Sequence, residues 1–142
     1  MVHDKTKLLF LTCCVCLSVA ALAAAFAQDQ KEVYFAKVDP DGVQRVRLEG
    51  GGYFFKPNRV VIKVNVPVEL LASREAGIVP HNLVIKAPEA GIAVEEELAA
   101  EPKKITFTAT AVGKYPFYCS NKLLFFASHR ERGMEGVLEV GP

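Results

Sequence analysis

The sequence predicts an all-β domain, a sandwich or barrel of about eight short strands. Short apolar runs alternate with period two along most of the chain, and Pro, Gly, Asn and Asp separate them at turn spacing. No stretch after residue 27 keeps a helical period for more than about ten residues. The length of 142 residues suits a single domain.

Residues 1–27 have the features of a secretory signal peptide. Lysines precede an apolar stretch at residues 8–25, and Ala25-Phe26-Ala27 stands before a polar residue as an A-x-A cleavage site. We therefore expect cleavage after Ala27 and a domain of residues 28–142 that is periplasmic or otherwise exported. The alternative is that residues 8–26 remain as a membrane anchor facing the periplasm, since about 20 apolar residues span a bilayer.

The first part of this domain, residues 28–50, predicts an antiparallel hairpin. An apolar run at residues 32–38 is followed by Asp39-Pro40-Asp41-Gly42. This is a strong turn signal, because proline presets φ and glycine accepts positive φ. A second alternating run follows at residues 43–48. The three glycines at residues 50–52 are expected to form a flexible joint.

Further strands are expected at residues 59–66, 68–72, 81–86, 105–110, 115–118 and 137–140. Residues 87–104 break this pattern, because Pro88, Gly91 and Pro102 interrupt it. The run Glu95-Glu96-Glu97 is expected in a solvated loop or a short helical turn, with an acidic docking face as the alternative.

The charge of the mature domain is balanced. After residue 27, fifteen Lys and Arg stand against fifteen Asp and Glu. Proteins that bind nucleic acids usually carry a strong basic excess, so no nucleic-acid partner is expected.

The mature domain holds one set of groups that bind soft metals. After residue 27 the sequence has one cysteine, two histidines and one methionine, which are Cys119, His81, His129 and Met134. Thiolate, imidazole and thioether ligands suit copper better than calcium or magnesium. A lone exported thiol is a liability unless it is buried or ligated. These four side chains equal one mononuclear ligand set, with none left over.

Nine residues lie between Cys119 and His129. A continuous helix over ten steps would carry its ends about 15 Å apart, too far to share a metal ion. We therefore expect the loop to double back, with at most a turn or two of helix. The longer spacing costs about 1 kcal/mol of closure entropy, against metal ligation on the order of 10 kcal/mol.

Three motifs carry a resemblance to a known family. Pro80-His81-Asn82 stands before a strand, Gly113 to Ser120 reads Gly-Lys-Tyr-Pro-Phe-Tyr-Cys-Ser, and Gly133-Met134-Glu135-Gly136 precedes the last strand. With the stretch at residues 53–57, they resemble the cupredoxins, nearest to the plastocyanin-like members. The Cys119-to-His129 spacing departs from this pattern, because those members place about two residues there.

The resemblance implies a Greek-key β-sandwich that binds one type 1 copper ion per chain. His81, Cys119 and His129 would be equatorial ligands and Met134 the weak axial ligand. Asn82 is expected to brace the Cys119 segment by hydrogen bonding.

The function expected is an exported one-electron carrier that is not an enzyme. It would act as a monomer with a redox protein such as a c-type cytochrome or a copper or haem oxidoreductase, and would contact the membrane only if the signal segment is retained. The alternatives are a periplasmic copper carrier or chaperone, and a metal-free interaction module. The apolar run Leu123–Phe126 would be either a lid packed on the sandwich or a docking patch beside His129.

Overall fold

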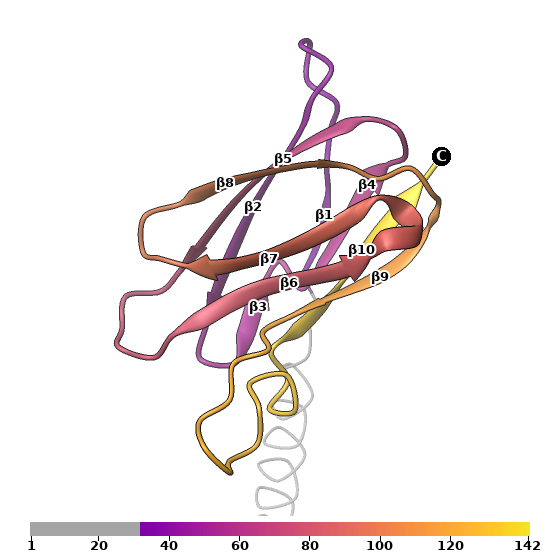
Figure 1. Ribbon diagram of the computed structural model, residues 1–142. Helices are drawn as coiled ribbons and strands as arrows, with labels where there is room; N and C mark the ends of the chain where they lie inside the picture. Colours follow the sequence, from indigo (N-terminus) through magenta and orange to yellow (C-terminus); the bar gives the residue numbers. More distant parts are fainter. Residues whose placement is uncertain (1–31) are drawn as a thin grey trace, which may run out of the picture. The chain divides into compact units, whose positions relative to one another are not determined.

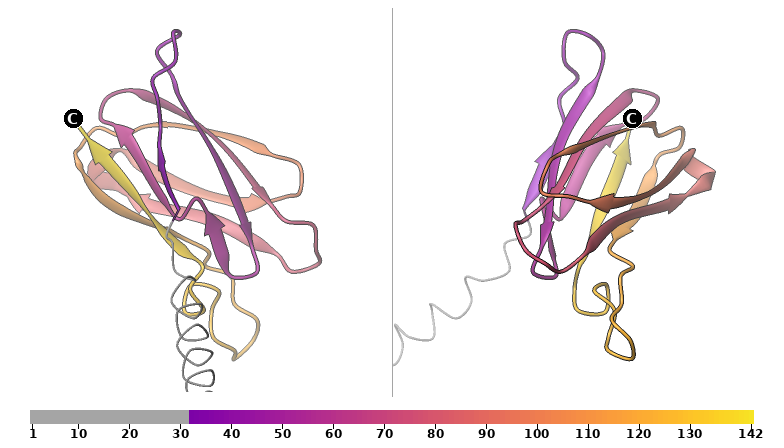
Figure 2. Two further views of the ribbon diagram at one scale, coloured as in Figure 1. Left: turned by 180° about the vertical axis from the view of Figure 1, so that it is seen from behind. Right: turned by 60° about the vertical axis from the view of Figure 1, so that its left-hand side comes forward.

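The computed structural model describes residues 32–142, which form two facing β-sheets (Figures 1 and 2). The strands of this part are β1 (Val33–Phe35), β2 (Gln44–Gly51), β3 (Phe54–Lys56), β4 (Arg59–Lys63), β5 (Pro67–Arg74), β6 (His81–Ala87), β7 (Ile92–Leu98), β8 (Lys103–Thr108), β9 (Gly113–Tyr118) and β10 (Glu135–Gly141). A 3₁₀ turn, η1 (Pro88–Ala90), lies between β6 and β7. The predicted signal peptide or anchor lies outside the described residues.

The larger sheet has the strand order β1-β4-β10-β9-β6-β7, and the smaller has β3-β2-β5-β8. Among residues 32–142, no helix is long and apolar enough to cross a membrane. The all-β sandwich prediction is confirmed, with ten strands in this part instead of about eight.

The core lies between the two sheets, and the period-two patterns explain it. In β2, for example, Val46 and Leu48 are buried whereas Arg47 and Glu49 are exposed. The alternation places one set of side chains against the opposite sheet and the other in solvent. Strand β6 is buried at six of its seven positions, so side chains on both faces of this strand are covered.

The predicted N-terminal hairpin is wrong in its strand pairing. The turn forms, with the Gly42 N–H donating to the Asp39 carbonyl at 2.9 Å and an antiparallel bridge between Val38 and Gln44. Beyond that bridge the strands separate, because β1 pairs in parallel with β4 and β2 pairs in parallel with β5. The turn signal is local and correct, whereas the pairing is decided by which sheet buries each strand.

Two other expectations are corrected. Residues Glu95-Glu96-Glu97 lie in strand β7, antiparallel to β6, and not in a loop or helical turn. They belong to a strand because Ile92, Val94 and Leu98 still recur on one buried face around them. Gly50 and Gly51 likewise end strand β2 and do not form a flexible joint.

Candidate metal centre

The candidate site lies at the end of the sandwich where β9 ends and where β6 and β10 begin. His81 is the first residue of β6, Cys119 follows β9, and Met134 precedes β10. Tyr118 of β9 pairs with Val84 of β6 on one side and with Glu135 of β10 on the other. This register brings the three segments together. The loop of residues 119–134 projects from this end, away from the C-terminus (Figures 1 and 2).

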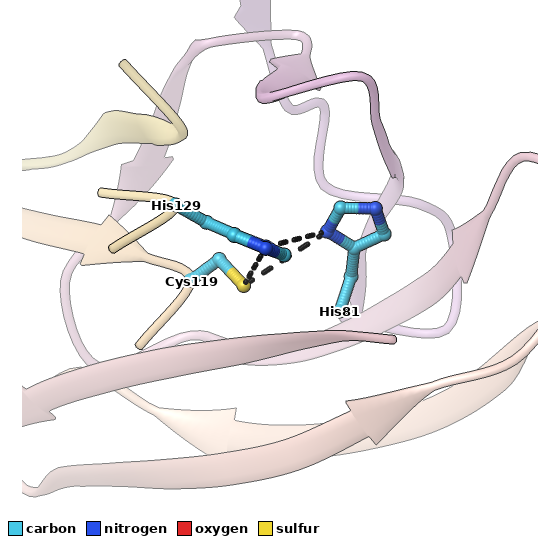
Figure 3. Close-up of side chains that lie close together, drawn as sticks. All are labelled: His81, Cys119 and His129. Atoms are coloured by element: carbon cyan, nitrogen blue, oxygen red, sulfur yellow. Dashed lines mark hydrogen bonds between the residues drawn. The ribbon is translucent and has the colours of Figure 1, made fainter. Parts of the chain in front are cut away.

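Three of the four predicted ligands converge. His129 Nδ1 lies 3.1 Å from His81 Nδ1 and 3.4 Å from Cys119 Sγ, and Cys119 Sγ lies 4.0 Å from His81 Nδ1 (Figure 3). All three residues are buried. The two imidazole nitrogens and the sulfur therefore face one another inside the protein.

The size of this triangle suits a single metal ion. With metal–nitrogen bonds of about 2.0 Å and metal–sulfur bonds of about 2.3 Å, as for zinc, a trigonal arrangement separates the donor atoms by about 3.5 to 3.8 Å. The observed separations of 3.1, 3.4 and 4.0 Å bracket that value. Small shifts of the side chains would equalise them.

Hydrogen bonds alone satisfy these atoms poorly. An imidazole Nδ1 carries either one proton or one lone pair in the ring plane, so it makes one good hydrogen bond. Here each Nδ1 has two polar neighbours within 4.0 Å. A cation between the three atoms would contact every one of them.

Asn82 braces the cysteine segment, as expected from the sequence. Its backbone N–H points at Cys119 Sγ at 3.4 Å. Its side chain accepts from the Ser120 N–H at 2.8 Å and donates to the Ser120 hydroxyl, also at 2.8 Å. The sulfur is thus fixed relative to β6 by contacts from the residue next to His81.

Burial controls the protonation of all three donors. It raises the pKa of the Cys119 thiol, although the backbone N–H groups of Asn82 and Asn121 act in the opposite direction. It lowers the pKa of His81, helped by the nearby His129 and Arg74, and lowers that of His129, helped by Arg132. The histidines are thereby kept neutral, which is the form that binds metal.

The long loop doubles back, as expected, and its hydrogen bonds show how. The His129 N–H donates to the Asn121 carbonyl at 2.9 Å, which closes the base of the loop. Ser128 and Glu131 form a capping box, since the Ser128 N–H donates to the Glu131 carboxylate at 2.6 Å and the Glu131 N–H to Ser128 Oγ at 3.2 Å. A single helical turn therefore presents His129 to the site.

Met134 lies beside the other three residues and has no exposed surface. Its carbonyl accepts from the Cys119 N–H at 3.1 Å, and its N–H donates to the His129 carbonyl at 2.9 Å. These two bonds tie the backbone of Met134 to both neighbours. Its place as the fourth ligand remains a prediction.

Two contacts at the site were not expected from the sequence. The ring of Tyr53 meets the His129 ring edge-on, with centroids 5.1 Å apart. Gly50 lies so close to Met134 that a Cβ placed there would be 3.0 Å from the methionine methyl carbon. No local pattern could have revealed either contact, because both join distant segments.

Comparisons with known proteins agree with this geometry at the level of the fold. No family model and no curated protein sequence matches the chain. Among solved structures, it is similar to the metal-binding domain of the Cu(I)-exporting P-type ATPase CopA of Streptococcus pneumoniae D39, solved with Cu(I). The TM-score is 0.59 at 20% identity, over 80% of this chain and 99% of that one.

Two further structures that are similar to the chain are a copper-containing nitrite reductase and a blue copper protein. The reductase, from Thermus scotoductus SA-01, has a TM-score of 0.54 at 17% identity, over 82% of this chain and 29% of that one. Auracyanin A from Chloroflexus aurantiacus has a TM-score of 0.53 at 18% identity, over 70% of this chain and all of that one. The described part of the chain therefore has the cupredoxin fold. Because these neighbours include an exporter domain and a reductase, the function must be argued from the site.

Proposed function

We propose that the protein binds one copper ion and acts as a one-electron carrier. His81, Cys119 and His129 would hold the ion, with Met134 as a weak fourth ligand. The observation that carries the proposal is the convergence of two Nδ1 atoms and one Sγ within 4.0 Å of each other in a buried pocket. When bound, copper supplies a reversible change between the cuprous and cupric states in such a site.

The residues of the chain supply rigidity and exclude water. His81 belongs to a buried strand, and Asn82 holds the Cys119 segment with three hydrogen bonds. His129 is set by the capped turn and by the bond from its N–H to Asn121. A donor set held from several sides rearranges little when the charge of the ion changes, which favours fast electron exchange.

Burial favours a carrier of electrons over a carrier of copper. Cys119 and Met134 have no exposed surface, and His81 and His129 have 5% and 7%. A chelator or client protein would have to open the site to remove the ion. Because all four side chains are almost fully buried, a substrate would have little access to the donor atoms, and we infer that the protein is not an enzyme.

The test of the site is visible and electron paramagnetic resonance spectroscopy of the chain loaded with Cu(II). We expect an intense thiolate-to-copper charge-transfer band that is lost in Cys119→Ser, because the serine hydroxyl cannot supply that transition. Lys122→Gln, an exposed change in the same loop, is the matched control and should keep the band. A parent chain without the band, or a Cys119→Ser variant that retains it, would contradict the proposal.

Copper delivery is the second candidate function, because the chain shares its fold with a Cu(I)-exporter domain. The two functions differ in retention of the ion. An electron carrier should keep copper through cycles of reduction and reoxidation in the presence of a Cu(I) chelator. Rapid loss of Cu(I) to the chelator would favour delivery instead.

We further infer that the protein works outside the cytoplasm, as a monomer. The signal-peptide features of residues 1–27 support export, and the partner would be a redox protein such as a c-type cytochrome or a copper or haem oxidoreductase. Amino-terminal sequencing of the exported protein would test the predicted start at Gln28.

A further inference from the structure

Residues Leu123–Phe126, the loop tip, expose four large apolar side chains in a row. Their exposed fractions are 65% for Leu123, 75% for Leu124, 84% for Phe125 and 48% for Phe126. The interpretation of this run as a lid packed on the sandwich is therefore wrong. Exposing this much apolar surface is costly unless something covers it.

The backbone holds the tip away from the sandwich. The bond from the His129 N–H to the Asn121 carbonyl closes the base, and the Phe126 N–H donates to the Leu123 carbonyl at 3.0 Å across the tip. Leu124 adopts a left-handed φ of 50° within this turn. Leu124 and Phe125 are the most exposed side chains of this loop, and the loop projects from the end of the sandwich (Figure 1).

The surroundings of the tip are apolar and cationic. Ile78 and Val79, from the loop before β6, are also exposed and line a surface groove together with Leu123 and Phe126. Lys122 and Arg132 line the same groove, and neither pairs with a carboxylate in the part of the chain that the structure describes.

Most of the other charged side chains at this end have a hydrogen-bond or ion-pair partner. Arg130 pairs with Glu135 at 3.0 Å, and the Glu131 carboxylate accepts from Ser128. Glu97 also lines the groove. The loop from residue 120 to residue 133 has three cationic side chains and one carboxylate, so its net charge favours an anionic surface.

The chain enters the sandwich at this same end. Strands β1, β4 and β10 run parallel, and β10 begins directly after Met134. The described part of the chain therefore begins at the end of the sandwich that carries the loop tip. The sequence outside the structure includes the apolar stretch at residues 8–25.

We propose that the loop tip inserts into the surface of an anionic lipid bilayer, with Lys122 and Arg132 beside the headgroups. A projecting turn of consecutive Leu and Phe residues fits a fluid apolar layer. Lys122 and Arg132 line the groove beside the tip, although Arg132 also donates to the Tyr53 hydroxyl at 3.2 Å, and their charges favour anionic headgroups. The inference does not depend on copper.

The test is flotation of the metal-free chain from Gln28 to Pro142 with phospholipid vesicles. This chain keeps all the residues of the described fold, and circular dichroism checks that it is folded. We expect binding to vesicles with one-third phosphatidylglycerol, weaker binding to pure phosphatidylcholine, and weakening by high salt. The double variant Leu124→Ser with Phe125→Ser should lose about tenfold or more in partitioning.

The matched control is Phe35→Ser with Val112→Ser. These residues are exposed at 68% and 59%, and Val112 lies just before β9, at the opposite end of the sandwich from the loop tip. This double variant removes a similar apolar area but should bind vesicles as the parent does. Equal losses in both double variants would overturn the assignment to the loop tip.

A fluorescence measurement makes the test independent of partitioning. The chain contains no tryptophan, so Phe125→Trp reports on the tip without background. Its emission should move to shorter wavelength when vesicles are added, whereas that of Phe35→Trp should not. Unchanged emission from Phe125→Trp would refute insertion. A third outcome is that the parent chain does not bind vesicles, while the tip variant loses electron exchange with a soluble redox protein. In that case the loop tip is a protein-docking surface and the lipid proposal is wrong.

Discussion

At the scale of single residues, Gly50 determines the space available to Met134. A Cβ at position 50 would lie 3.0 Å from Met134 Cε, 3.1 Å from Leu98 Cδ1 and 3.2 Å from Phe55 Cε1. Each of these contacts is tighter than is usual for a Cβ, and all three neighbours belong to the core. A side chain at this position must therefore displace the thioether or its neighbours.

We expect Gly50→Ala to lower the free energy of unfolding of the metal-free chain by about 1–3 kcal/mol, as overpacking does. In the copper-loaded chain it should also alter the electron paramagnetic resonance spectrum, because Met134 shifts. Gly77→Ala is the control, since a Cβ there meets nothing within 4 Å. Urea unfolding of the two variants would measure the difference in the free energy of unfolding. Equal values would show that the neighbouring core side chains can move aside for a Cβ at position 50.

At the scale of elements, β10 connects the site to the rest of the larger sheet. It lies between β4 and β9. On it, the Glu139 carboxylate accepts from Arg59 of β4 at 2.5 Å and lies 3.9 Å from Lys114 Nζ of β9. The hydrogen bond from Arg59 is the main cause that lowers the pKa of Glu139, and the charges of Arg59 and Lys114 contribute.

The lowered pKa of Glu139 makes a prediction about acid stability. A carboxylate with a lower pKa in the folded state stabilises the fold above its unfolded-state pKa, and this stabilisation is lost as the pH falls through the folded-state pKa. Glu139→Gln should therefore be less stable than the parent at pH 7, and the difference should disappear on acidification below the folded-state pKa. Glu101→Gln removes an exposed carboxylate that is absent from the ion pairs of residues 32–142.

Thermal melts of these variants across the acid range would measure the effect. The difference between Glu139→Gln and the parent should shrink steadily as the pH falls, whereas Glu101→Gln should follow the parent throughout. A difference for Glu139→Gln that is the same at all pH values would mean that packing, and not charge, links β10 to β4.

At the scale of the whole molecule, the fold and the metal centre are separable. The buried apolar side chains of the core come from both sheets and run the length of the sandwich. The donor atoms occupy only one end of it. The hydrophobic core therefore supplies most of the driving force for folding, and a bound metal ion would add to a structure that forms without it.

Removal of copper should accordingly leave the fold intact. We expect the chelated chain to keep its β-sheet circular dichroism and to unfold cooperatively, at a lower temperature than the loaded chain. A free-ligand concentration one hundred times the dissociation constant adds about 2.7 kcal/mol. Calorimetry with and without copper would measure the shift, and a chain that unfolds on chelation would show that the metal is required for folding.

The sequence predicted the strands in which buried and exposed side chains alternate. It missed or mispaired the strands whose formation or pairing depends on contacts with distant parts of the chain. Strand β7 was missed because its exposed glutamates obscure the buried face of Ile92, Val94 and Leu98. The pairing of β1 with β4 and of β2 with β5 was not predictable, because each of these pairs joins strands that are not consecutive in the chain. The projection of the loop tip also depends on a bond between Asn121 and His129 that no local pattern encodes.

By itself, the sequence determined the chemistry of this protein: a thiol, two imidazoles and a thioether, in a domain of alternating strands. These properties depend on residue type and on period-two burial, both of which are local. Only the tertiary structure decided that His81 and Cys119, 38 residues apart, bring Nδ1 and Sγ to 4.0 Å, and that the loop tip faces outward. Both depend on the register between strands, which is set by packing across the whole sandwich.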